Sequence, residues 1–217
     1  MEMLKNKIQL PNIYPIIDIS LISSDKIGET AQAIIDGGAK ILQLRAKKLS
    51  SGEFLEAAHI IRKITKDKGA GFIVNDRIDI ALLTDADGVH LGQDDLPVKE
   101  ARRLLGNNKI IGYSTHNLRE ARAAKKLPVD YISFGPIFAT KTKEDAQTPK
   151  GLKGLAEVMK AVKIPIVAIG GITEANIVHV LKEGADSAAM ISEILGAKDI
   201  SQKINRLIFT AKEIKRH

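Results

Sequence analysis

The 217-residue chain contains no cysteine and no tryptophan, and only 4% of its residues are aromatic. The absence of cysteine excludes disulfide scaffolds, thiolate zinc sites and cysteine nucleophiles, and it suits a reducing compartment. The longest apolar run, residues 164–172, has nine residues, whereas a membrane-spanning helix needs about 20. The first residues also contain no apolar stretch typical of a secretory signal. We therefore expect a cytoplasmic protein without a membrane partner.

The chain is basic, with 33 Lys+Arg against 26 Asp+Glu and a net charge of +7. Such a charge is compatible with a nucleic-acid partner, with small anionic ligands or with a basic surface alone. Three tyrosines and five phenylalanines, with no basic helix face, offer no stacking platform for nucleic-acid bases. We therefore expect no nucleic-acid partner. With 44% hydrophobic residues, the length suits one catalytic domain over residues 1–217.

Short apolar, β-branched runs alternate with amphipathic stretches along the sequence, which predicts a parallel sheet covered by helices. The runs are 13–18, 41–45, 71–75, 88–91, 110–114, 131–135, 164–170 and 187–191. The clearest helical stretches between and after them are 53–65, 97–105, 173–183 and 199–214. Eight such units favour an α/β fold with a single (β/α)₈ TIM barrel. A doubly wound open sheet is the rival, but the first strand lacks the glycine-rich turn of dinucleotide-binding sheets.

In a barrel of this type, functional side chains gather at the carboxyl ends of the strands. Gln43, Arg45 and Lys47 share one face of the second strand because side chains alternate with a period of two. Buried charges need partners, so this set predicts a donor array for an anionic ligand. A solvated barrel rim with one structural ion pair is the alternative.

Acidic and amide groups follow the next two strands. Asn75 and Asp76 end the third strand, and Asp94 and Asp95 follow the fourth. Such oxygen donors, without cysteine or a spaced histidine pair, suit a hard cation such as Mg²⁺. Helix capping is the alternative, with Asp76 capping a helix at residue 77 and Asp94 or Asp95 capping one at Pro97.

Further candidates lie at the remaining strand ends. Residues 114–117 offer ligand contacts or a helix cap, and the polar, lysine-bearing loop 135–151 is long enough for a lid or binding element. Gly170 and Gly171 follow the seventh strand, where barrels of this fold often hold phosphate, and Thr173 is a candidate helix cap. The histidine positions show no metal-binding spacing. We therefore expect structural roles for His90 and His179.

Seven motifs, in order along nearly the whole chain, resemble the thiamine phosphate synthase family. They are QLRAK (43–47), NDR (75–77), GVHLGQDD (88–95), GYSTH (112–116), DYISFGPIFATKTK (130–143), IPIVAIGGI (164–172) and MISEI (190–194). The resemblance implies a Mg²⁺-dependent barrel enzyme acting on small phosphorylated substrates. It would join 4-amino-2-methyl-5-hydroxymethylpyrimidine diphosphate to 4-methyl-5-(2-hydroxyethyl)thiazole phosphate and release pyrophosphate.

The resemblance also implies roles for individual residues, carried over from the matching motifs. Asp76 and Asp95 would bind one Mg²⁺, and Arg45, Lys47, Ser114 and Lys143 would be catalytic. The residues expected to contact the pyrimidine diphosphate are Gln43, Arg45, Lys47, Asn75, Ser114 and Lys143. Those expected on the thiazole phosphate side are Thr140, Gly171, Ile191 and Ser192.

The chain departs from the family pattern at Ala46, where many relatives carry an acidic residue, and in its first strand, YPIID. Strand alternation turns residue 46 away from the site face, so we expect little effect. The main rival is a thiazole tautomerase-like paralogue on the same barrel, which lacks the diphosphate-binding set. Arg45, Lys47, Asp95 and Lys143 together favour the synthase.

Overall fold

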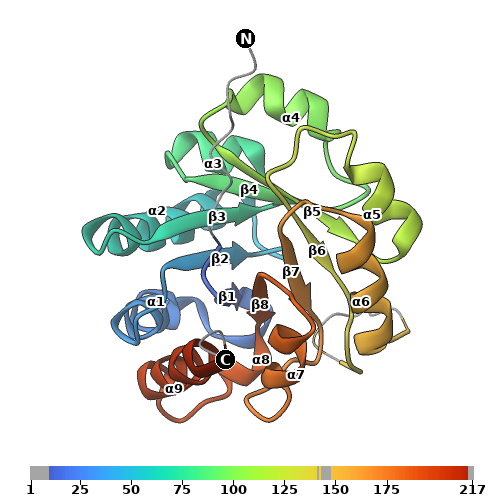
Figure 1. The fold of residues 1–217 in the computed structure, drawn as a ribbon. Coiled ribbons are helices and arrows are strands. Elements are labelled where there is room, and N and C mark those ends of the chain that lie inside the picture. The colour runs from blue at the N-terminus through green and yellow to red at the C-terminus, as the bar shows by residue number, and fades with distance from the viewer. Residues whose placement is uncertain (1–9, 141, 143–147, 215–217) are drawn as a thin grey trace.

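The computed structural model describes residues 10–140, 142 and 148–214. Within these residues, eight parallel strands close into a barrel in which each strand pairs with its neighbours in chain order and β8 returns to β1 (Figure 1). The strands are β1 (Ile13–Asp18), β2 (Ile41–Arg45), β3 (Gly71–Asn75), β4 (Gly88–Leu91), β5 (Ile110–Thr115), β6 (Tyr131–Phe134), β7 (Ile166–Ile169) and β8 (Ser187–Met190). The predicted (β/α)₈ barrel is therefore confirmed.

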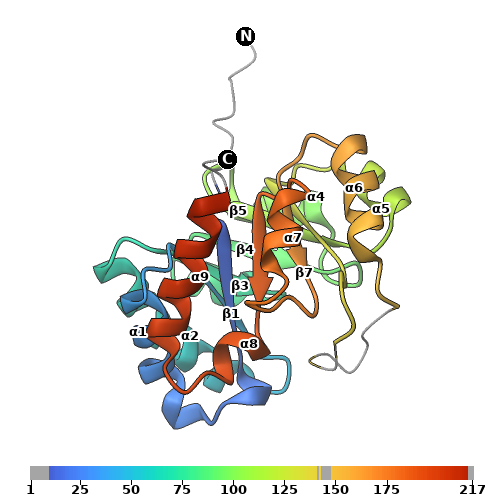
Figure 2. The same ribbon diagram turned by 60° about the horizontal axis from the view of Figure 1, so that its bottom comes forward.

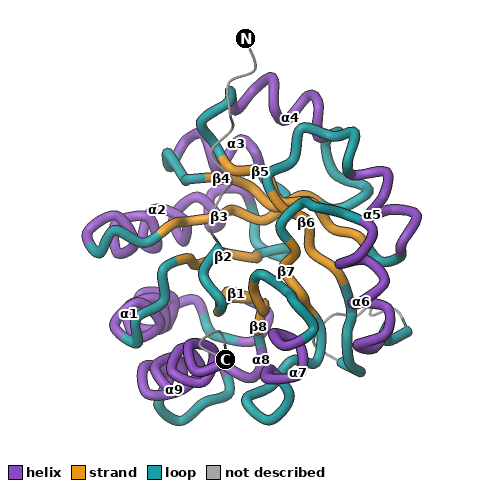
Figure 3. The backbone as a smooth tube through the Cα atoms, in the orientation of Figure 1, coloured by secondary structure: helices purple, strands orange, loops and turns teal. Residues whose placement is uncertain are grey.

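Helices follow the strands and surround the barrel, as the alternation of strand and helix along the chain shows (Figure 3). They are α1 (Ile27–Asp36), α2 (Ser51–Asp67), α3 (Ile78–Leu83), α4 (Val98–Leu105), α5 (Leu118–Ala124), α6 (Gly151–Ala161), α7 (Ile177–Lys182), α8 (Ser192–Leu195) and α9 (Ile200–Ile214). In Figure 2, α9 lies beside α1, so the last helix covers the seam where β1 meets β8. No helix among the described residues is long and apolar enough to span a membrane.

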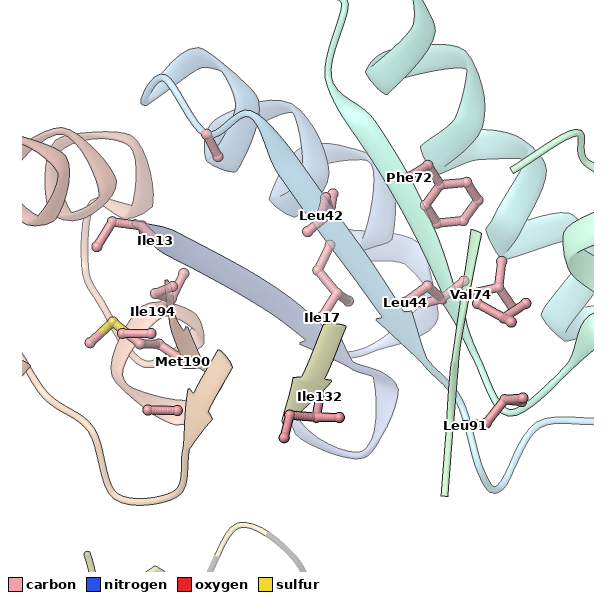
Figure 4. Close-up of a cluster of buried hydrophobic side chains, with 14 of the residues drawn as sticks. Ile13, Ile17, Leu42, Leu44, Phe72, Val74, Leu91, Ile132, Met190 and Ile194 are labelled. Atoms are coloured by element: carbon pink, nitrogen blue, oxygen red, sulfur yellow. The ribbon is translucent and has the colours of Figure 1, made fainter. Parts of the chain in front are cut away.

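Side-chain alternation divides the core into two layers. Leu42 and Leu44 of β2 point outward with Phe72 and Val74 of β3 into the layer between barrel and helices (Figure 4). The opposite faces of the strands point into the barrel, where a second cluster contains Tyr14, Ile16, Ile41, Ile73, Tyr131, Val167 and Ala189. The predicted division of β2 is thus confirmed, and the polar side chains at its carboxyl end face the barrel axis.

The helix starts differ from the predicted caps at three places. The residue before α3 is Arg77 and the one before α4 is Pro97, and neither gains a side-chain cap from Asp76, Asp94 or Asp95. The predicted Thr173 cap is wrong as well. Helix α7 begins later, at Ile177, because residues 173–176 form a separate turn in which Asn176 Oδ1 accepts from the Thr173 N–H at 2.8 Å. Asp76, Asp94 and Asp95 are therefore not side-chain caps of α3 or α4.

Candidate active site

A cavity of about 390 Å³ opens at the carboxyl ends of the strands. Residues from all eight strands, or from the loops that follow them, line it. Eleven of the residues predicted from the sequence are among them: Gln43, Arg45, Lys47, Asn75, Asp76, Asp95, Ser114, Thr140, Gly171, Ile191 and Ser192. The twelfth, Lys143, lies outside the described residues. The structure thus brings the described members of the predicted set to one place, and their individual roles remain predictions.

Arg45 is held by a carboxylate that the sequence analysis did not single out. Asp18, at the end of β1, is 1% exposed, and its Oδ2 accepts from Arg45 Nη1 at 2.5 Å. The other oxygen, Oδ1, accepts from the backbone N–H and the hydroxyl of Ser20, at 3.0 and 2.7 Å. The parallel register places Asp18 directly beside Arg45. A buried, fully engaged carboxylate fixes the guanidinium at the cavity wall.

Two carboxylates, Asp76 and Asp95, face each other at the cavity rim. Burial, together with the hydrogen bond and charge of Asp95, raises the pKa of Asp76 to about 6. Lys47 Nζ lies 3.6 Å from Asp76 Oδ2 and offsets part of this repulsion. Asp95 Oδ2 is oriented by the backbone N–H of Gly92 at 2.6 Å.

This donor set fits a hard divalent cation, which would relieve the repulsion between Asp76 and Asp95 and which prefers carboxylate oxygen. Protein groups alone would not complete its coordination. No cluster of three or more His, Asp or Glu side chains suited to a metal occurs within residues 10–140, 142 and 148–214. A small cation of this class usually retains water ligands and is also coordinated by oxygens of a bound phosphate. Two carboxylates from the protein are therefore sufficient.

The loops after β6, β7 and β8 meet at the opposite side of the cavity. Gly170 and Gly171 adopt φ angles of 99° and 62°, and a Cβ at Gly171 would lie 2.5 Å from the Ala139 carbonyl oxygen. Glycine is required there because the two loops are packed backbone against backbone. Thr142 Oγ1 donates to Ser192 Oγ at 3.2 Å, which joins the loop after β6 to the start of α8.

Lys203, on α9, forms ion pairs that connect the loop after β7 to α8 on this side of the cavity. Lys203 Nζ lies 2.7 Å from Glu174 Oε2, in the loop after β7, and 2.8 Å from Glu193 Oε1, in α8. Glu193 Oε1 also accepts from the Glu174 N–H at 3.3 Å. These contacts have no signal in the sequence because their members come from three separate segments of the chain.

Tyr14, Tyr131 and His90 also line the cavity, although none of them was predicted as a site residue. Their polar atoms form a continuous series of contacts that reaches Ser114. One signal was present: residues 14, 16 and 18 share a strand face by period two, so Tyr14 and Asp18 both point into the barrel. The pairing of Tyr14 with Tyr131 depends on barrel closure and has no local signature.

Comparisons with known proteins identify the family of the chain. The family model described as thiamine monophosphate synthase matches residues 13–194. A thiamine-phosphate synthase of Pelotomaculum thermopropionicum is 50% identical over 187 residues, covering 85% of this chain and 86% of that protein. One from Chloroflexus aurantiacus is 46% identical over 195 residues, covering 90% of each chain.

Among solved structures, a thiamine phosphate pyrophosphorylase from Pyrococcus furiosus superimposes with a TM-score of 0.84 at 37% identity, covering 94% of this chain and 96% of that one. A 3-hexulose-6-phosphate synthase, with a TM-score of 0.67 and 20% identity, covers 92% of this chain and 99% of its own and shares the fold alone. By its family model and its relatives, the chain belongs to the thiamine monophosphate synthase family.

Proposed function

We propose that this chain is a thiamine-phosphate synthase, a transferase of thiamine biosynthesis. It joins 4-amino-2-methyl-5-hydroxymethylpyrimidine diphosphate to 4-methyl-5-(2-hydroxyethyl)thiazole phosphate and releases pyrophosphate. The observation that carries the proposal is the convergence of Arg45, Lys47 and the Asp76–Asp95 pair on one side of a single cavity. The glycine-bearing loop after β7 and the start of α8 form the other side. The cavity therefore offers separate places for a diphosphate and for a monophosphate.

The reaction breaks the bond between the pyrimidine methylene carbon and the diphosphate oxygen, and the thiazole nitrogen then bonds to that carbon. Such a step requires stabilisation of charge on the departing diphosphate more than it requires a general base. Arg45, aligned by Asp18, and Lys47 supply positive charge to that group. Lys143, predicted from the sequence, belongs to the same set and lies outside the described residues.

Asp76 and Asp95 are the residues that would hold one Mg²⁺. When bound, the ion would neutralise charge on the diphosphate. Gln43, Asn75 and Ser114 are assigned to the pyrimidine diphosphate. The residues assigned to the thiazole phosphate are Thr140, Gly171, Ile191 and Ser192. Of these, Gly171 lies in the loop after β7 and Ser192 begins α8, so both can present backbone N–H groups to a phosphate.

We assign the protein to the cytoplasm, with phosphorylated small molecules as its partners and no nucleic-acid or membrane partner. The relatives named thiamine-phosphate synthase support a small phosphorylated partner. Arg45 and Lys47 face the cavity, where they would meet a small phosphorylated ligand, so these two cations need no macromolecular anion to explain them.

The test is a product assay with purified protein, Mg²⁺ and both substrates. We expect stoichiometric release of pyrophosphate and formation of thiamine phosphate. The thiazole tautomerase alternative predicts isomerisation of a thiazole phosphate precursor with no pyrophosphate release, so that precursor is assayed in parallel. Absence of thiamine phosphate with fresh substrates and metal would refute the synthase assignment.

A further inference from the structure

A continuous series of hydrogen bonds crosses the barrel interior beneath the cavity. Gln43 Nε2 donates to Tyr14 Oη at 3.1 Å, and the hydroxyls of Tyr14 and Tyr131 lie 2.8 Å apart. Tyr131 Oη lies 3.0 Å from His90 Nδ1, and His90 Nε2 lies 3.0 Å from Ser114 Oγ. We call these five residues the hydrogen-bond chain. It joins β2, β1, β6, β4 and β5 in turn.

The protons in the hydrogen-bond chain have one consistent direction when Gln43 donates. Tyr14 Oη accepts from Gln43, so the Tyr14 proton is available for its other contact, Tyr131 Oη. Tyr131 then uses its own proton on His90 Nδ1. With a proton on Nδ1, Tyr131 would have to accept from His90, and the single contact between the two hydroxyls would leave one of the two tyrosine protons without an acceptor. Both tyrosines are 1% exposed, so such a loss is costly. Nδ1 therefore accepts, and the imidazole carries its proton on Nε2.

Two further observations indicate that the residues of the hydrogen-bond chain are held in fixed positions. Burial raises the pKa of both Tyr14 and Tyr131 above the usual range, so each tyrosine keeps its proton. The Tyr131 and His90 rings stack with centroids 5.4 Å apart. Gly112, between them on β5, makes room for this contact: a Cβ there would lie 2.1 Å from Tyr131 Cζ and 2.4 Å from His90 Nδ1.

The consequence appears at Ser114, which lines the cavity. His90 Nε2 is closer to Ser114 Oγ, at 3.0 Å, than to Ser133 Oγ, at 3.3 Å. A hydroxyl oxygen that accepts from an imidazole N–H keeps its own proton for another partner. That proton is free to point into the cavity, where it would meet an acceptor on the ligand.

We propose that the hydrogen-bond chain is a positioning device that fixes the His90 tautomer and so presents the Ser114 hydroxyl as a hydrogen-bond donor to an acceptor atom of the substrate. The identity of that substrate as the pyrimidine diphosphate rests on the proposed function. Tyr14, Tyr131 and His90 are thus positioning residues for the pyrimidine side, because they act through Ser114.

The first test measures the tautomer directly and uses no substrate. Long-range ¹H–¹⁵N spectra of the full-length protein distinguish an imidazole protonated on Nε2 from one protonated on Nδ1, and His90→Gln identifies the His90 signal by its loss. We expect the Nε2–H form in the wild type and a shift toward the other tautomer in Tyr131→Phe, which removes the donor to Nδ1. Tyr14→Phe should keep the Nε2–H form, because Tyr131 can still donate to Nδ1. A wild-type His90 protonated on Nδ1 would overturn the proposal, whatever the outcome of the product assay.

The second test is kinetic. We expect Tyr131→Phe to raise KM for the pyrimidine diphosphate about tenfold, roughly the effect of losing one hydrogen bond, while KM for the thiazole phosphate changes less than about twofold. Ser187→Ala is the control, since it removes a buried hydroxyl that donates to the Pro11 carbonyl oxygen at 2.6 Å, outside the hydrogen-bond chain and outside the cavity lining. If both variants behave alike, or if both KM values rise together, the hydrogen-bond chain has only a structural role. His90→Leu, which removes the partner of Ser114 Oγ, replaces Tyr131→Phe if the latter fails to fold.

Discussion

At the scale of single residues, the site combines two unfavourable features in Asp76. Its φ of 64° lies in the left-handed region, which costs a non-glycine residue about 1–2 kcal/mol, and burial beside Asp95 disfavours its charge. Strain of this kind is retained where the surroundings enforce it, and it clusters at functional sites. The backbone N–H of Asp76 donates to the His90 carbonyl oxygen at 2.9 Å, which holds the strained residue in place. The backbone strain and the burial of the carboxylate both support the proposed role of Asp76 in the site.

Asp95→Asn tests the carboxylate pair with little change of shape, because an amide oxygen can still accept from the Gly92 N–H. We expect kcat/KM to fall at least about 100-fold and the dependence on Mg²⁺ to disappear. Steady-state assays across a Mg²⁺ titration measure both effects. The control is Asp94→Asn, which removes the same charge one position earlier. Equal losses in the two variants would argue against a specific metal role for Asp95.

Asp18→Ala tests the partner of Arg45. Removing the buried carboxylate leaves a largely buried guanidinium unpaired, which we expect to lower the free energy of unfolding by about 3 kcal/mol. Urea denaturation followed by circular dichroism measures the change. Asp36→Ala is the control, because its ion pair with Lys68 has both side chains about half exposed, and such pairs contribute at most about 1 kcal/mol. A loss for Asp18→Ala no larger than that of the control would contradict the assignment.

At the scale of secondary-structure elements, sequence periodicity predicted the barrel well because each strand and helix has a local signature. The predicted 13–18, 41–45, 71–75 and 88–91 strands agree with β1 to β4 residue for residue. Alternation along β2 correctly placed Gln43 and Arg45 inside the barrel. Contacts between elements had no such local signal. Lys203 lies on an ordinary amphipathic helix, and its ion pairs with Glu174 and Glu193 form because α9 packs beside the loop after β7 and beside α8.

Lys203→Met tests whether α9 supports the proposed monophosphate site. The change keeps the length of the side chain but removes the charge that joins the loop after β7 to α8. We expect KM for the thiazole phosphate to rise about fivefold, since one charge-assisted contact pair is lost, with KM for the pyrimidine diphosphate unchanged. Lys212→Met, at an exposed position on the same helix, should alter neither value. A uniform rise in both KM values would indicate general loosening of the barrel instead.

At the scale of the whole molecule, the positions of the site residues follow from the topology. Strand ends that are far apart in sequence meet at one rim because all eight strands are parallel, and the sequence allowed this convergence to be predicted. It did not reveal the hydrogen-bond chain, because the contact between Tyr14 and Tyr131 joins residues 117 positions apart. Interior polar networks depend on barrel register, and register is settled by packing across the molecule and not by any local motif.

Ligand binding should stabilise the whole fold. A ligand that binds only the native state at about 100 times its Kd adds about 2.7 kcal/mol, which for a chain of this size raises Tm by about 5–10 °C. We therefore expect pyrophosphate with Mg²⁺ to produce such a shift in a thermal melt, and either component alone to produce less. In Asp95→Asn the combined shift should disappear. A full shift in that variant would place the anion elsewhere.

Barrel closure has a consequence for how the protein is made. β1 pairs with β8 through residues 13–15 and 188–190, and the Ala188 N–H donates to the Asn12 carbonyl oxygen at 2.8 Å. During synthesis β1 therefore emerges from the ribosome long before its partner β8. The edge of β1 that pairs with β8 stays unpaired while some 170 further residues are added. Unpaired edges of this kind attract other chains. The ribosome-bound intermediate, and not the finished ring, is the form of this protein that most needs protection from aggregation.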